Sequence, residues 1–181
     1  MSEVKIKKRK DGDIELRRIA PKHAAALFAL VDQNRTRLRE WLPWVDKTKT
    51  TEDVLAFIKK TKKKGEIHHV IFKNQTLVGI IGLHHIDHDN RKAIIGYWLA
   101  KEVEGQGIMT RAVRLVLQYA FNELKLHRVT IDCATGNAKS CAIPERLGFT
   151  REGQMRDSEW LYDHFVDLKR YSILEHEFKN L

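Results

Sequence analysis

The sequence of 181 residues predicts one α+β domain built around a single mixed sheet. In the centre of the chain, segments rich in Ile, Val and aromatic residues are separated only by short turn-like sequences, which is typical of antiparallel strands. On both sides of them, apolar residues recur three and four positions apart, which is typical of helices. The length suits one domain better than two, so we expect residues 1–181 to fold together without a metal or a disulfide.

The N-terminal part predicts one short strand followed by three helical segments. Residues 14–19 have the composition of the strand, and Pro21 opens a helix because its fixed φ suits the first helical position. Residues 35–42 are expected to form a second, short helical piece that ends near Pro43. Thr50 and Asp53 have the spacing of a capping box, so a third helix is expected to begin there.

The rest of the chain predicts strands that alternate with two helices. Pro144 lies inside the second helix, where it removes a backbone hydrogen bond, so we expect a kink or an early stop there. The order of the elements favours a mixed, mostly antiparallel sheet flanked by helices. The strands are expected at residues 68–72, 76–86, 92–100, 128–134, 153–161 and 165–174, and the helices at 109–124 and 138–147.

Charge and composition limit the compartment and the partners. The formal net charge is +9, and much of it comes from basic runs at residues 5–10 and 59–64. Such runs are either solvated faces or a means of attracting anions, namely a phosphate-rich cofactor or RNA. They contain no aromatic residue to stack on bases, so a nucleic acid is not the expected partner. No apolar run approaches a membrane span or a secretory signal, and Cys133 and Cys141 make no disulfide framework, so we expect a cytoplasmic protein.

The sharpest local feature is the sequence EGQGIMT at residues 104–110, between a strand and a helix. Gly105 and Gly107 let the backbone bend so that several N–H groups point at one spot, and the helix dipole adds positive potential there. Such a turn suits a pyrophosphate. Taken alone, however, two glycines before a helix more often make an ordinary turn.

Five segments occur in a characteristic order along the chain: LREWLPW (38–44), IGYWLA (95–100), GQGIMTRAV (105–113), NAKS (137–140) and ERLGF (145–149). With these segments the chain resembles the GNAT acetyltransferase superfamily, and within it the ribosomal-protein N-terminal acetyltransferase (RimJ/RimL-type) branch. The resemblance implies a GNAT-like domain that transfers acetyl from acetyl-CoA directly to a primary amine, most simply the N-terminal amine of a ribosomal protein, without a metal. Paired subunits are common in the family, which makes a homodimer an option.

The resemblance also assigns the acetyl-CoA site. Tyr97, Trp98 and Leu99 would run beside the pantetheine arm, with the N–H of Leu99 holding the acetyl carbonyl as its oxyanion forms. Asn137 would bond to the cofactor's amide region, although its position also suits a plain helix N-cap. The superfamily's phosphate motif begins with Gln or Arg and ends with Gly or Ala, whereas Glu104 and Met109 stand there in this chain. Backbone N–H groups are unaffected by that departure, so the pyrophosphate cradle is expected from Gly105, Gln106, Gly107, Ile108, Met109 and Thr110.

Two side chains are candidates for the proton transfers. Ser140 takes the place of a hydroxyl that the family keeps near the sulfur, so we assign it as general acid to the departing thiolate; the alternative is a first-turn serine without chemistry. Glu159 matches a glutamate of this branch near the attacking amine, so we assign it as general base or amine anchor. A surface carboxylate is the alternative there, and Glu152 and Asp157 are its rivals.

Other conspicuous residues receive lesser roles. Trp41, Trp44 and Trp160 are expected to wall the acceptor pocket, although large aromatic residues are more often core. His84 and His85, beside an acidic turn, suggest zinc ligands, but neighbours in a strand face opposite sides of a sheet and need a bulge to share one ion. Cys141 lacks an evident His partner and is expected to be buried and inert.

Two other functions stay open at this point. One is acetylation of a small-molecule amine such as a polyamine or an amino-sugar. The other is a catalytically degenerate module that binds RNA or the ribosome through the basic surface. Binding of acetyl-CoA that persists at high salt would favour the enzyme, whereas steeply salt-dependent RNA binding would favour the module.

Overall fold

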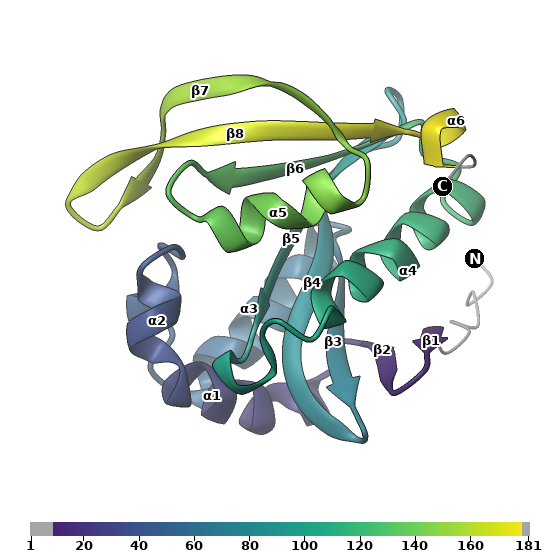
Figure 1. Ribbon diagram of the computed structural model, residues 1–181. Coiled ribbons are helices and arrows are strands. Elements are labelled where there is room, and N and C mark those ends of the chain that lie inside the picture. The colour runs from purple at the N-terminus through teal and green to yellow at the C-terminus, as the bar shows by residue number, and fades with distance from the viewer. Residues whose placement is uncertain (1–8, 179–181) are drawn as a thin grey trace.

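The computed structural model describes residues 9–178, in which eight strands form one sheet of order β1-β2-β3-β4-β5-β6-β8-β7 (Figure 1). All neighbours in this sheet pair antiparallel except β5 and β6, which are parallel. The prediction of an α+β fold with a mixed, mostly antiparallel sheet is therefore confirmed. The strands are β1 (Arg9–Asp11), β2 (Ile14–Arg18), β3 (Ile67–Lys73), β4 (Thr76–Asp87), β5 (Lys92–Leu99), β6 (Arg128–Ala134), β7 (Thr150–Leu161) and β8 (His164–Leu174).

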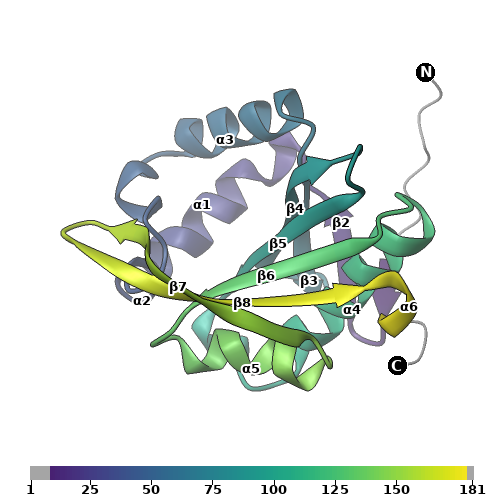
Figure 2. The same ribbon diagram turned by 90° about the horizontal axis from the view of Figure 1, so that it is seen from above.

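Helices cover the sheet on both faces (Figure 2). Two apolar cores result, one on each face of the sheet. Adjacent residues of β4 point into different cores: Ile80 packs with the helices between β2 and β3, and Ile81 packs with the helices that follow β5 and β6. A strand buried on both faces reads as a continuous apolar run rather than an alternating one, as β4 does. One face carries α1 (Ala24–Gln33), α2 (Arg35–Arg39) and α3 (Thr51–Lys63), and the other carries α4 (Ile108–Asn122) and α5 (Ala138–Arg146).

Local signals placed most of these elements correctly. The capping box at the start of α3 is present, since the N–H of Asp53 donates to the Thr50 hydroxyl and the Thr50 N–H donates to the Asp53 carboxylate at 3.0 Å. The sequence did not predict β1 or the short α6 (Glu175–Phe178). No helix within residues 9–178 is long and apolar enough to cross a membrane.

Two expectations need correction. Helix α5 does not stop early at Pro144 but continues to Arg146. The basic run at residues 5–10 is not only a solvated face, because Arg9 lies in β1, is buried and pairs with Glu123 at 2.5 Å. Residues 5–8 of that run lie outside the described part of the chain.

Candidate active site

The parallel strands β5 and β6 diverge after a short pairing. Their register covers only residues 92–94 of β5 and 128–130 of β6, although β5 continues to Leu99 and β6 to Ala134. The second half of each strand therefore borders a wedge-shaped gap in the middle of the sheet. β6 stays fully paired with β8 on its other side, so the gap separates two intact sheet halves.

The ladder between β4 and β5 decides which backbone groups face this gap. The N–H of Ala100 donates to the carbonyl of Val78 at 2.8 Å, which makes them a hydrogen-bonded pair. Hydrogen-bonded and non-hydrogen-bonded pairs alternate along an antiparallel ladder, and the register has no shift here. The N–H and C=O groups of residues 97 and 99, beyond the last pair with β6, therefore point away from β4 and toward the gap. The edge offers a ladder of donors and acceptors to an extended ligand.

A turn with free backbone N–H groups lies just beyond the end of β5. Gly105 and Gly107 have φ of +74° and +69°, left-handed values that glycine adopts without strain. Gly107 is the N-cap of α4, and no side chain from residues 9–178 caps the first turn of this helix, where N–H groups lack helical partners. The Gln106 amide accepts from Lys73, and the Thr110 hydroxyl accepts from Arg146 at 3.0 Å. Backbone donors and two cationic side chains thus surround this turn.

Pro144 explains how Ser140 is held on the opposite side of the gap. A proline at position 144 has no N–H to donate to the carbonyl of residue 140, which it would do in a regular helix. The hydroxyl of Tyr97 on β5 donates to that freed carbonyl at 3.1 Å, and the Ser140 hydroxyl in turn donates to the Tyr97 oxygen at 3.3 Å. Asn137 caps α5 by accepting from the Ser140 N–H at 3.1 Å, so its N-cap role is confirmed.

Glu159 reaches the same cavity from β7. Within residues 9–178, no hydrogen bond or ion pair to its carboxylate is present. Burial, and then the nearby charge of Asp132, raise the pKa of Glu159. Its two rivals lie elsewhere: Glu152 is held by Arg128 at 2.7 Å and by Ser172, and Asp157 is exposed in a bulge of β7.

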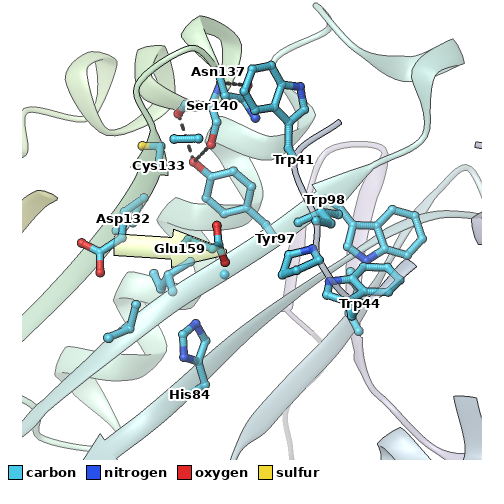
Figure 3. A pocket seen from close by; sticks show the side chains of 18 of the residues that line it. Trp41, Trp44, His84, Tyr97, Trp98, Asp132, Cys133, Asn137, Ser140 and Glu159 are labelled. Atoms are coloured by element: carbon cyan, nitrogen blue, oxygen red, sulfur yellow. Dashed lines mark hydrogen bonds between the residues drawn. The ribbon is translucent and has the colours of Figure 1, made fainter. Parts of the chain in front are cut away.

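The cavity has a volume of about 670 Å³ and runs between the diverging strands and the loop that follows α2 (Figure 3). Ser140, Asn137 and Tyr97 line it together with Glu159. Its walls are mostly apolar and aromatic, which is usual for small-molecule sites. The loop after α2 contributes Trp41 and Trp44, and β5 contributes Trp98.

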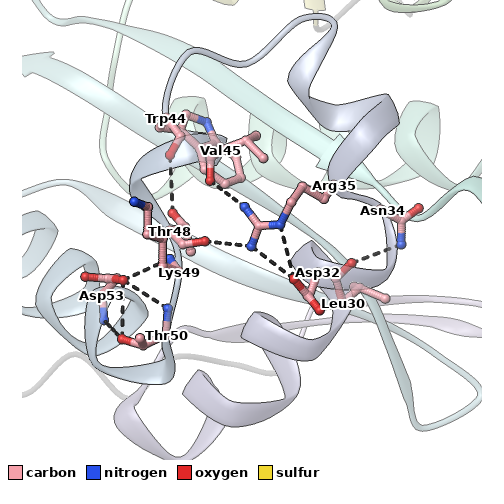
Figure 4. Close-up of polar contacts among 10 residues, drawn as sticks. All are labelled: Leu30, Asp32, Asn34, Arg35, Trp44, Val45, Thr48, Lys49, Thr50 and Asp53. Carbon is pink, nitrogen blue, oxygen red and sulfur yellow. Dashed lines mark hydrogen bonds and ion pairs between the residues drawn. The ribbon is translucent and has the colours of Figure 1, made fainter.

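Two of the three expected tryptophans are in this wall. Trp44 packs against Trp98 with ring centroids 6.2 Å apart, and Arg35 fixes its loop by donating to the carbonyls of Val45 and Thr48, both at 2.8 Å (Figure 4). Trp160 is not in the wall, so that expectation is wrong. It follows Glu159 in a strand and faces the other way, where it is 50% exposed and packs on Phe165.

His84 and His85 both line the cavity, although neighbours in a regular strand were expected to face opposite sides of the sheet. β4 carries a bulge after His84, and His85 has φ of +50°, so the two rings lie 5.1 Å apart and both line the cavity. Burial lowers the pKa of His84 to about 4, which keeps this ring neutral at pH 7. In the described part of the chain, no three His, Cys, Asp or Glu side chains are grouped to hold a metal ion.

Sequence reasoning also missed Asp132, Arg170 and Cys133, which line the cavity. Arg170 donates to both oxygens of Asp132, at 2.8 and 2.7 Å. Cys133 is buried and free, and burial raises the pKa of its thiol. Cys141 is buried as expected, and its thiol faces the carbonyl of Ala134 at 3.6 Å. No local signal in the sequence marks this group, because alternation in a strand places the neighbours Asp132 and Cys133 on opposite faces and Arg170 lies on another strand.

The model of the acetyltransferase (GNAT) domain family matches residues 13–150 of the chain. The chain belongs to the GNAT acetyltransferase family. It is an N-acetyltransferase that uses acetyl-CoA, and the diverging strands and the glycine turn lie in its single GNAT-fold domain.

Relatives of this GNAT protein place it more closely. It is 40% identical over 171 residues to the "Putative ribosomal N-acetyltransferase YdaF" of Bacillus subtilis (strain 168), covering 92% of this chain and 93% of that one. The "Ribosomal-protein-serine acetyltransferase" of Escherichia coli (strain K12) is 30% identical, with 88% and 91% covered. A solved structure of the ribosomal L7/L12 alpha-N-protein acetyltransferase RimL with coenzyme A has a TM-score of 0.87 at 28% identity, with 93% and 98% covered. A spermidine N(1)-acetyltransferase of E. coli (strain K12) is 24% identical, with 82% and 79% covered.

The described residues fit acetyl-CoA in two ways. The open edge of β5 can pair with the amide groups of a pantetheine arm, and the first turn of α4 offers donors to a pyrophosphate. Glu104, which departs from the GNAT phosphate motif, does not leave an uncompensated negative charge beside them. Its carboxylate accepts from Arg37 at 2.5 Å and from Lys139 at 2.7 Å.

Gly107→Val is expected to weaken acetyl-CoA binding by about 5- to 30-fold. A Cβ at this position meets no atom within 4 Å, so the side chain clashes with nothing in the protein. The cost comes from φ of +69°, which disfavours an L-residue by about 1–2 kcal/mol and pulls the N–H groups of the turn out of line. Calorimetric titration with acetyl-CoA measures the change.

Gly65→Val is the matched control for this glycine. Gly65 has φ of +71° and equally open surroundings, but it lies after α3, away from the cavity. Both variants should lose similar stability, and only Gly107→Val should lose affinity. Unchanged affinity in Gly107→Val would contradict the assignment of the pyrophosphate to this turn.

Proposed function

We propose that this enzyme acetylates the N-terminal α-amine of a protein, with a ribosomal protein as the leading acceptor, in the cytoplasm. The names of two relatives that cover about nine-tenths of the chain support this class of acceptor. Acetylation of a polyamine is the second candidate, because a spermidine acetyltransferase is also a relative.

The charge of the cavity favours the α-amine. Asp132 and Glu159 are its only acidic lining residues among those described, and Arg170 already neutralises Asp132. Glu159 therefore supplies one uncompensated negative charge, which suits an acceptor with one ammonium group. Additional ammonium groups of a polyamine would lie against apolar walls or near Arg170, where a charge without a partner is costly.

Three groups would carry out the transfer. An α-amine has a pKa near about 8, so Glu159 needs only modest basicity to take its proton, directly or through water. The neutral amine attacks the thioester carbonyl, and the N–H of Leu99 stabilises the oxyanion that forms. When the tetrahedral intermediate collapses, the C–S bond breaks and Ser140 protonates the departing thiolate, while the proton that the amide nitrogen still has to lose returns to the serine oxygen, directly or through water. The acetyl group passes directly to nitrogen, and no acyl-enzyme is needed.

The test of the acceptor class compares three amines in a thiol-release assay. The first is a peptide with a free α-amine and no lysine, the second is the same peptide with a blocked N-terminus and one lysine, and the third is spermidine. We expect kcat/KM for the peptide with the free α-amine to exceed the values for the other two substrates by about tenfold or more. The lysine peptide carries its amine on a long side chain, and spermidine brings additional positive charges. A higher kcat/KM for spermidine would overturn the proposal.

A further inference from the structure

Arg37 on α2 joins parts of the cofactor cleft that are far apart in sequence. One guanidinium nitrogen donates to the carboxylate of Glu104 at 2.5 Å, and another donates to the carbonyl of Leu99 at the end of β5. The second oxygen of Glu104 accepts from Lys139 on α5, which lies across the gap. Arg37 and Glu104 are only 27% and 21% exposed, so solvent screens this pair less than a surface pair.

A neighbouring contact holds the same segment from the same side. Asn34, between α1 and α2, accepts from the N–H of Lys101 at 2.9 Å, and its amide donates to the carbonyl of Leu30 at 3.0 Å (Figure 4). Asn34 is buried. The α1–α2 junction therefore fixes the backbone on both sides of Ala100, between the open edge of β5 and the glycine turn.

The contact to Leu99 matters because of the group it controls. In an extended residue the N–H and C=O point to the same side of the strand, so a donor that fixes the carbonyl of Leu99 also fixes the direction of its N–H. A hydrogen-bond donor stabilises an oxyanion well only when it is oriented beforehand. Displacement of such a group by about 1 Å can cost about 100-fold in rate.

We propose that Arg37 is a positioning residue for acetyl transfer. It holds the backbone of Leu99 so that the N–H of this residue faces the transferred acetyl group, and Glu104 orients Arg37 instead of contacting phosphate. The inference rests on the proposed role of the Leu99 N–H. It gives a reason for Glu104 at the start of the phosphate motif, where the family usually has Gln or Arg.

The decisive variant is Arg37→Ala, assayed with whichever amine the wild-type enzyme acetylates. We expect kcat to fall by about 10- to 100-fold, while the Kd of acetyl-CoA, measured by calorimetry, changes by less than about threefold. Glu104→Gln keeps the arginine on Leu99, so its kcat should fall less. The double variant should be no slower than Arg37→Ala, because Glu104 acts through Arg37.

Rescue separates positioning from a purely structural role. Guanidinium ions at millimolar concentration should restore part of the kcat of Arg37→Ala by refilling the vacated site. Arg39 lies on the same helix as Arg37 and forms an exposed ion pair with Asp46. Arg39→Ala, which removes that pair, should keep the wild-type kcat with or without guanidinium. If Arg37→Ala does not fold, Arg37→Lys, which offers one donor point instead of a fork, decides by the same readouts.

Two results would overturn the inference. One is an unchanged kcat in Arg37→Ala. The other is a fall in kcat that guanidinium does not reverse, together with an equally large loss of affinity for acetyl-CoA. Failure of the acceptor proposal looks different. If spermidine proves to be the substrate, the same variants are compared with spermidine, and the expected pattern is unchanged.

Discussion

Glu159→Gln is expected to lower kcat/KM by about 100-fold or more while acetyl-CoA binding is preserved. The substitution keeps the shape of the side chain but removes its charge and its basicity. Glu159 lines the cavity and has no protein partner within residues 9–178, so its carboxylate is available to the amine. The cofactor does not need this group, and calorimetry with acetyl-CoA should give the wild-type Kd.

The pH–rate profile should distinguish the base from the acceptor. Burial and the charge of Asp132 raise the pKa of Glu159, so its protonation should inhibit the enzyme at a higher pH than an ordinary glutamate would. Protonation of the acceptor amine also lowers the rate at acid pH. The limb that belongs to the amine should persist in Glu159→Gln, and the limb that belongs to Glu159 should disappear.

Neighbouring carboxylates control for a general loss of charge. Asp157→Asn should behave like the wild type, because Asp157 is exposed and its contact to Asp167 is made by the backbone N–H. Glu152→Gln should cost some stability through its contacts to Arg128 but little activity. If either control abolishes activity while Glu159→Gln stays near wild type, the base has been placed on the wrong residue.

A stability measurement shows whether any loss of activity comes from unfolding. A carboxylate whose folded pKa is raised costs stability as pH rises from its unfolded pKa through the folded value. Removing that charge should therefore leave Glu159→Gln at least as stable as the wild type at pH 7. The difference in Tm should shrink toward pH 4, where the wild-type carboxyl is also neutral.

Ser140→Ala is expected to lower the single-turnover rate of acetyl transfer by about 100-fold, with little change in acetyl-CoA affinity. The hydroxyl is proposed to act late, on the departing thiolate. The backbone N–H of Ser140 keeps its bond to Asn137 in the variant, so the start of α5 is retained. Rapid-quench measurement of the acetylated product isolates this step from product release.

Ser140→Thr provides the matched comparison because it keeps the hydroxyl. Its rate should lie nearer the wild type than that of Ser140→Ala. An unaltered single-turnover rate in Ser140→Ala would return this residue to a first-turn helix serine. In that case the hydroxyl of Tyr97, 3.3 Å from the Ser140 hydroxyl, becomes the next candidate for the acid.

Local sequence signals predicted the fold well because they describe local physics. The capping box at Thr50 and the turn glycines near α4 are set by residues close in the chain, and the structure contains both. Pro144 shows where local signals fail. The sequence predicts that this proline removes a helical hydrogen bond, but the hydroxyl that replaces the lost donor comes from Tyr97, more than forty residues earlier in the chain.

The remaining errors arise where pairing between distant strands decides the geometry. The gap between β5 and β6 is a lack of hydrogen bonds, which no residue pattern records. A bulge in β4 brings His84 and His85 to one side, against the simple alternation of a strand. Alternation does hold at Glu159 and Trp160, and applying it there would have excluded Trp160 from the pocket.

Direct transfer inside one cavity is the central claim, and Cys133 in its wall is the alternative route. Because burial raises the pKa of this thiol, it is a poor nucleophile, and an acyl-enzyme is not expected. Initial rates of thiol release, measured while acetyl-CoA and the amine are both varied, test the claim. Intersecting lines in the double-reciprocal plot are predicted, because both reactants must be bound together. Parallel lines would indicate a ping-pong reaction through an acetylated enzyme and would contradict the account.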